Sequence, residues 1–146
     1  MLMMKRISVL AVCSAVAACL LNSHAAEKKA PVKIDASKLP PAADKQGVTY
    51  ATDMKPIFDK SCIKCHGEAK QKGKLRLDSL AAVLKGGQDG KVVEAGKSTE
   101  SMLIANVAHL GDEDDWMPPP DNKEKIPALT KEQIALIRAW IDQGTK

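Results

Sequence analysis

Two thiols and an imidazole stand close together in the sequence C-I-K-C-H at residues 62–66. Thiols three residues apart at the end of a helix can both reach the two vinyl groups of one haem. The adjacent imidazole of His66 then lies on the same side and can bind the iron. The spacing therefore predicts a covalently attached haem, with Cys62 and Cys65 as the attachment points and His66 as an iron ligand.

Three other uses of this cysteine pair compete with haem attachment. A structural zinc site needs four ligands, usually from two separated pairs, and the other two cysteines, Cys13 and Cys19, fall in the N-terminal leader described below. A thioredoxin-like redox pair would need a βαβ setting, which the helical pattern of this chain does not support. A disulfide would close so short a loop that it would add little stability.

A second axial ligand would complete an iron site, and methionine is a common donor in haem proteins that carry electrons. Met117 is followed by three consecutive prolines, which fix φ and remove backbone donors, so its loop is stiff and suited to holding a sulfur over iron. We expect Met117 to be the distal ligand. His109 and Met102 are the alternatives, whereas Met54 is too close in sequence to His66 to reach the opposite haem face easily.

Four segments have the apolar spacing and the end signals of short helices. They cover residues 53–61 with Asp53 as N-cap, 79–85, 99–109 with Ser98 as N-cap, and a last helix that begins after Thr130 and ends before Gly144. The last is the clearest, because Thr130 and Gln133 can form a capping box. Only residues 74–77 offer a short strand candidate. The sequence predicts an all-α fold of roughly three to five short helices with long loops.

The first 25 residues have the pattern of an export signal. Two basic residues precede an uncharged apolar run at residues 7–21, which is shorter than the roughly 20 residues that span a bilayer, and small residues allow cleavage after Ala25. The alternative is a lipoprotein signal, because residues 16–19 resemble a lipobox that would leave a lipidated Cys19 at the mature N-terminus. We expect export to the periplasm or beyond, with a membrane tether only if Cys19 is lipidated.

Composition adds weaker expectations. Residues 26–47 are rich in Lys, Ala and Pro and predict a flexible linker, so the folded domain is expected to cover residues 48–146. Aromatic residues make up only 3% of the chain, and a core so poor in aromatic area would gain from a bound haem. Lysines gather around the cysteines and residues 112–115 are acidic, which indicates either solvated surface or a docking face for a redox partner protein. With 22 basic and 18 acidic residues, no nucleic-acid partner is expected.

From about residue 48 onward, the chain resembles the cytochrome c domains known as planctomycete-type. The resemblance is carried by sequence blocks that follow the order of the family: Lys55-Pro56-Ile57-Phe58, Cys62-Ile63-Lys64-Cys65-His66-Gly67, Gly73-Lys74-Leu75-Arg76-Leu77-Asp78, Met117-Pro118-Pro119 and Trp140-Ile141-Asp142-Gln143-Gly144. It implies a class I-like cytochrome c fold around one covalent haem c, with His66 as the proximal ligand and Met117 as the distal one. Residues 94–96 depart from the family pattern, because the family often has a proline before the glycine at the position of Gly96.

Two axial ligands would leave iron no open position for a substrate, so we expect outer-sphere electron transfer to a redox partner protein rather than an enzyme activity. Beyond the haem motif, no cluster of acids, histidines or nucleophiles suggests a substrate pocket. A haem-containing docking or ligand-sensing module, or an accessory electron-entry subunit of a larger oxidoreductase, is the alternative.

Overall fold

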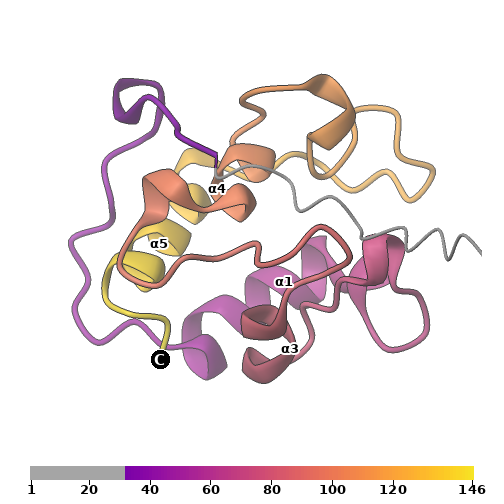
Figure 1. Cartoon of the computed structure of the whole chain (residues 1–146), viewed down its shortest axis with the longest axis horizontal. Helices are drawn as coiled ribbons and strands as arrows, with labels where there is room; N and C mark the ends of the chain where they lie inside the picture. Colours follow the sequence, from indigo (N-terminus) through magenta and orange to yellow (C-terminus); the bar gives the residue numbers. More distant parts are fainter. Residues whose placement is uncertain (1–31) are drawn as a thin grey trace, which may run out of the picture.

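The computed structural model describes residues 32–146, which form short helices joined by long loops (Figure 1). The α-helices are α1 (Lys55–Ser61), α2 (Ile63–His66), α3 (Leu80–Lys85), α4 (Met102–Val107) and α5 (Lys131–Asp142). A π-helix (Tyr50–Met54) precedes α1, and 3-10 turns lie at Ala36–Lys38, Lys72–Lys74, Ser98–Glu100 and Glu113–Asp115. Across residues 32–146 there is no strand, so the predicted all-α class is confirmed. No helix in that range is long and apolar enough to cross a membrane.

Helix α1 leads directly into the first cysteine. The helical segment begins at Thr49, whose side chain caps the π-helix, and Pro56 occupies the first turn of α1, where its missing donor costs nothing. Asp53 was expected as the N-cap but lies inside the π-helix, because the segment starts four residues earlier and the Asp53 carboxylate accepts from the Thr49 N–H (3.0 Å). The α-helix ends at Ser61, and Cys62 is its C-cap.

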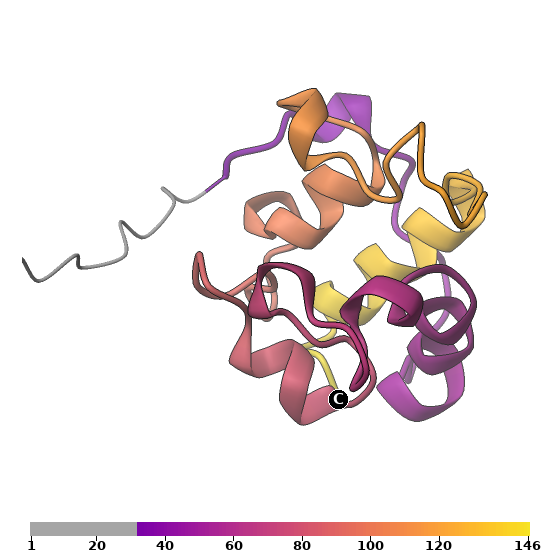
Figure 2. The same ribbon diagram turned by 90° about the vertical axis from the view of Figure 1, so that its right-hand side faces the viewer.

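Three aromatic rings hold the first and last helices together. Phe58 of α1 meets Trp140 of α5 edge to face, with ring centroids 6.3 Å apart, and both side chains are fully buried. Tyr50 lies 6.1 Å from Phe58 and 6.3 Å from Trp140. Figure 2 shows α5 running between the segments that contain α1 and α4. This aromatic cluster therefore packs α1 against α5.

Helix α5 has the predicted ends. Thr130 and Gln133 form the capping box, and Gly144 follows the helix with a φ of 91°, a value that glycine adopts without strain. Ile137 and Ile141 are fully buried on the apolar face. This amphipathic stripe packs α5 into the core.

Helix α4 is shorter than predicted, and its expected cap has another role. The N–H and hydroxyl of Ser98 donate to the two carboxylate oxygens of Asp142 at the end of α5 (2.9 and 3.0 Å). Ser98 is the first residue of a 3-10 turn rather than the cap of α4. The N-cap position of α4 is occupied by Ser101. Residues 74–77 form no strand. By contrast, α3 has the expected bounds and is capped by Ser79.

Residues 32–47, here called the N-terminal strap, lie against the helical domain. Ile34 N–H donates to Thr99 O (2.9 Å), and Ala43 N–H donates to Ala135 O in α5 (3.0 Å). Leu39 is buried in the core. Figure 1 shows the strap following the edge of the molecule beside α5.

The strap is the described part of the segment predicted as a flexible linker, and these contacts hold it against the domain. Its boundary with the domain at residue 48 stays a prediction. The predicted export signal and the first residues of the predicted linker, 1–31, lie outside the described residues.

Candidate functional site

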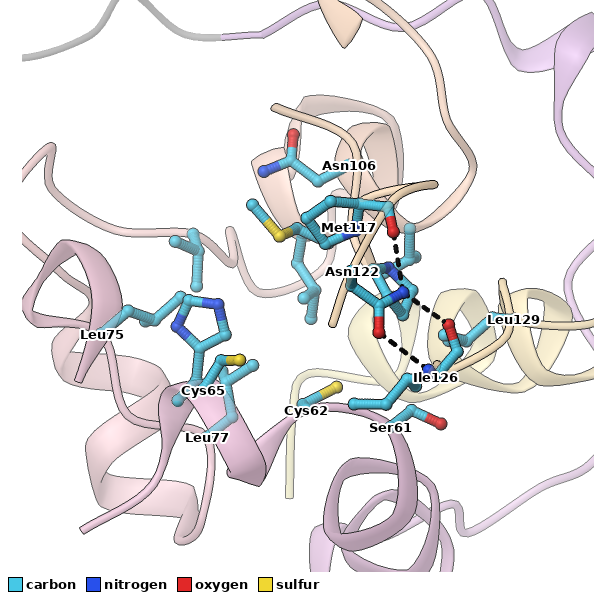
Figure 3. Close-up of a pocket in the computed structure, with 16 residues that line it drawn as sticks. Ser61, Cys62, Cys65, Leu75, Leu77, Asn106, Met117, Asn122, Ile126 and Leu129 are labelled. Atoms are coloured by element: carbon cyan, nitrogen blue, oxygen red, sulfur yellow. Dashed lines mark hydrogen bonds between the residues drawn. The ribbon is translucent and has the colours of Figure 1, made fainter. Parts of the chain in front are cut away.

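A largely apolar cavity, partly open to solvent, lies between the helices. Its wall is built from the junction of α1 and α2, residues 75–77, helix α4 and the loop that precedes α5. Figure 3 shows Cys62 and Cys65 on one side of the cavity and Met117 with Asn106 across from them.

The two cysteines reach the cavity because the chain makes a second helical turn immediately after α1. Cys62 O accepts from the N–H groups of Cys65 (3.0 Å) and His66 (2.9 Å), so α2 is a single tight turn. Residues three apart on such a turn lie on the same face. Both cysteines are free thiols and line the cavity. Burial, with a smaller contribution from the neighbouring Cys65, raises the pKa of the Cys62 thiol to about 12.

His66 lines the same cavity and has an unpaired nitrogen. Its Nδ1 is buried and has no hydrogen-bond partner, although buried polar atoms are normally paired. Burial lowers the pKa of His66, and the backbone of Leu75 and Lys72 opposes this only in part. The backbone of the residue is fixed, since His66 O accepts from Leu77 N–H (2.7 Å). A buried, neutral imidazole is the form that binds a metal ion.

Met117 enters the cavity from the loop between α4 and α5. Its N–H donates to the backbone oxygen of Asn106 in α4 (3.0 Å), which ties the start of the loop to the helix. The Met117–Pro118 peptide bond is cis. Pro118 and Pro119 continue the cavity wall beside the methionine. The cavity thus brings together all four residues expected from the sequence, although Met117 and His66 are far apart in the chain.

Sequence reasoning missed Asn122, which also lines the cavity. Its side chain bonds to the backbone of Pro119 and Ile126 on either side of it. Asparagine after prolines is typical of turns in which the side chain bonds to nearby backbone, and this local signal was available in the sequence.

The alternative iron ligands lie elsewhere. Neither His109 nor Met102 lines the cavity. His109 instead stacks on Trp116, with ring centroids 4.9 Å apart and planes 7° apart. Met54 is fully buried in the core. Within residues 32–146 no three His, Cys, Asp or Glu side chains form a metal-binding group, so the ligand set of the zinc alternative is not assembled there.

The residues around this cavity were compared with known protein families. Residues 62–121 match the family model described as Planctomycete cytochrome C, and the match spans both cysteines, His66 and Met117. This match supports a planctomycete-type cytochrome c domain that includes these residues. Searches of curated proteins and of solved structures found no match. A cytochrome c domain implies covalently bound haem c, and the family indicates a haem-binding electron carrier.

The cavity of the cytochrome c domain fits a haem on the chemistry of its donors. Two free thiols, an unpaired imidazole nitrogen and a thioether line one largely apolar space. Thiol, imidazole and thioether are the groups that attach haem and bind its iron in c-type cytochromes. The apolar wall, which includes Leu77 and Leu103, matches the apolar faces of a porphyrin.

Proposed function

We propose that this chain is an exported cytochrome c with one haem, held by Cys62 and Cys65 and ligated by His66 and Met117, that carries electrons between partner proteins. The observation that carries the proposal is the convergence of these four side chains on one largely apolar cavity. Two segments separated by about fifty positions in the sequence contribute them.

The cysteines would attach the group by an addition that needs no oxidant. Each cysteine would hold the haem through a thioether bond to one of its vinyl groups, and the addition of a thiol to a vinyl group balances in atoms and electrons. The position of Cys62 and Cys65 on one helical turn lets both sulfurs act on the same molecule. The attachment also anchors His66, because it is the next residue in the chain.

His66 and Met117 would supply both protein ligands of the haem iron. The haem would supply a one-electron iron couple, and a thioether ligand favours the ferrous state relative to a second imidazole. With both ligands bound, no substrate could bind the iron directly. The domain would therefore transfer electrons rather than catalyse a reaction of its own. The apolar side chains around the cavity would limit the access of water to the haem, which would strengthen electrostatic effects on the couple.

Export is the second part of the proposal. It is supported by the sequence of residues 1–25, with a basic start, an apolar run and small residues before Ala26. The intact mass of the protein recovered from the whole cell envelope distinguishes cleavage after Ala25 from lipidation at Cys19, since the lipidated form would begin at Cys19 and carry added acyl chains.

The decisive test is covalent attachment of the haem. Protein matured in a host that assembles c-type cytochromes is denatured, extracted with acidic acetone, and its spectrum is recorded in alkaline pyridine with reductant. We expect the pigment to stay on the wild-type chain and to be lost from the double variant Cys62→Ala/Cys65→Ala. The matched control is Lys64→Ala, since Lys64 lies between the cysteines but is exposed. Pigment lost from the wild type would refute the proposal and return the pair to a disulfide or another metal.

A further inference from the structure

The loop that carries Met117 has few means of fixing its own backbone. Three consecutive prolines follow the methionine, and none of them has an N–H to donate. The loop forms no regular helix between the 3-10 turn Glu113–Asp115 and α5. Its conformation must therefore be held by hydrogen bonds other than the repeating backbone bonds of a helix.

One side chain supplies these partners. The Asn122 Nδ2 amide donates to the backbone oxygens of Pro119 (2.8 Å) and Ile126 (2.9 Å), and its Oδ1 accepts from the Ile126 N–H (2.8 Å). The Asn122 N–H adds a bond to Pro119 O (3.1 Å). Figure 3 shows these bonds drawn from Asn122 to both sides of the loop, beside Met117. The Asn122 side chain thus closes residues 119–126 into a hydrogen-bonded ring.

The Asn122 bonds and the bond from Met117 N–H to Asn106 O restrain the same short stretch of chain. Pro119, whose oxygen accepts two of these bonds, is two residues from Met117. On the other side, Met117 N–H is bound to Asn106 O of α4 (3.0 Å). The prolines between these points fix φ, so little freedom is left to the methionine backbone. Asn122, Ile126 and Met117 all line the cavity.

We propose that Asn122 is a positioning residue that keeps the Met117 sulfur over the haem iron, and that it thereby sets how easily an added ligand displaces the methionine. This inference rests on the proposed ligation of iron by His66 and Met117. Asn122 acts through the loop, because its own polar atoms are used by Pro119 and Ile126. Loss of the ring increases the fraction of molecules in which the thioether is off the iron.

The size of the effect follows from the bonds lost. Asn122→Asp keeps an acceptor for the Ile126 N–H but removes both amide donations, and Asn122→Ala removes all three side-chain bonds. An added ligand binds only the methionine-off state, so its apparent affinity rises in proportion to the population of that state. Two lost hydrogen bonds raise that population by about tenfold or more.

The experiment uses the full-length, haem-loaded protein and imidazole as the probe ligand. The ferric protein is titrated with imidazole and followed by its visible spectrum, and the reduction potential is measured for each variant. Met117→Ala serves as the reference for an open iron. The matched control is Gln143→Ala, because the Gln143 amide also bonds to backbone on both sides, to Lys45 O (2.7 Å) and from Val48 N–H (3.2 Å), but lies outside the Met117 loop.

We expect both Asn122 variants to bind imidazole at least about tenfold more tightly than the wild type and to have a lower reduction potential, with Gln143→Ala unchanged in both. If Met117→Ala opens the iron but the Asn122 variants match the wild type, the positioning role is wrong and the proposed ligation stands. If Met117→Ala itself leaves the iron unchanged, the ligation is wrong and the inference falls with it. An equal change in Gln143→Ala would show general destabilisation and also overturn the inference.

Discussion

The ion pair between the N-terminal strap and the π-helix makes the stability of the domain depend on pH. Lys45 of the strap bonds to Asp53, whose carboxylate also accepts from Thr49 N–H (3.0 Å) and the Thr52 hydroxyl (2.7 Å). The Lys45 ammonium, followed by the Thr49 and Thr52 donors, lowers the pKa of Asp53 from 3.8 to about 2. Only the Lys45 bond requires the strap to lie against the π-helix, because Thr49 and Thr52 belong to the same helical segment as Asp53.

The magnitude follows from this difference in pKa between the unfolded and folded chain. A change from 3.8 to about 2 corresponds to at most about 2 kcal/mol of folding free energy. Solvent screening reduces it, because the Lys45 side chain is 55% exposed, and about 1 kcal/mol remains. Since the folded pKa is the lower one, this contribution is complete above a pH of about 4 and is lost as the pH falls toward 2.

The assay is urea unfolding of the haem-loaded protein at a series of pH values, for the wild type and Asp53→Asn. At pH 7 we expect the variant to be less stable by about 1 kcal/mol, with the difference shrinking as the pH approaches 2. Asp59→Asn is the matched control, because its pair with Lys55 (2.6 Å) is exposed on one helix and should change stability by less than about 0.5 kcal/mol. A difference that stays constant from pH 7 to 2 would refute the assignment of the effect to the Asp53 charge.

Two further variants test the core and the site. Met117→Ala should keep haem attached but lower the reduction potential and let carbon monoxide bind the ferrous iron; an unchanged potential, measured by spectroelectrochemistry, would move the distal ligand to His109 or Met102. Phe58→Ala should lower the free energy of unfolding by about 3–5 kcal/mol, because it empties a fully buried site between Tyr50 and Trp140. Thermal unfolding checks this, and a loss below about 1 kcal/mol would mean that the aromatic cluster does not hold α1 to α5.

The parts of the structure that depend on near neighbours were predictable from the sequence. The capping box of Thr130 and Gln133 involves residues three apart, and it marks the start of α5 correctly. Ser79 caps α3 through the Ala82 N–H in the same local way. The haem motif is equally local, since Cys62 O accepts from the N–H groups of Cys65 and His66.

The parts that depend on distant partners were not predictable in this way. Ser98 has the residue type and position of a helix cap, yet its hydroxyl and N–H bond to Asp142, 44 residues away. The strap has the composition of a linker, but its backbone finds acceptors at Thr99 and Ala135, far along the chain. No pattern within the strap itself reports these acceptors, because they are backbone groups that any residue could provide.

The two sides of the proposed haem site are built by different means. His66 lies on a helical turn that continues α1, and its backbone oxygen is tied to Leu77 N–H (2.7 Å), so the fold itself fixes it. Met117 lies on a loop held at one end by Asn106 and closed by the Asn122 amide. Loops open at lower free energy than packed helices. The distal side is therefore where changes in sequence can tune ligand exchange and reduction potential while the covalent anchor and the proximal ligand stay in place.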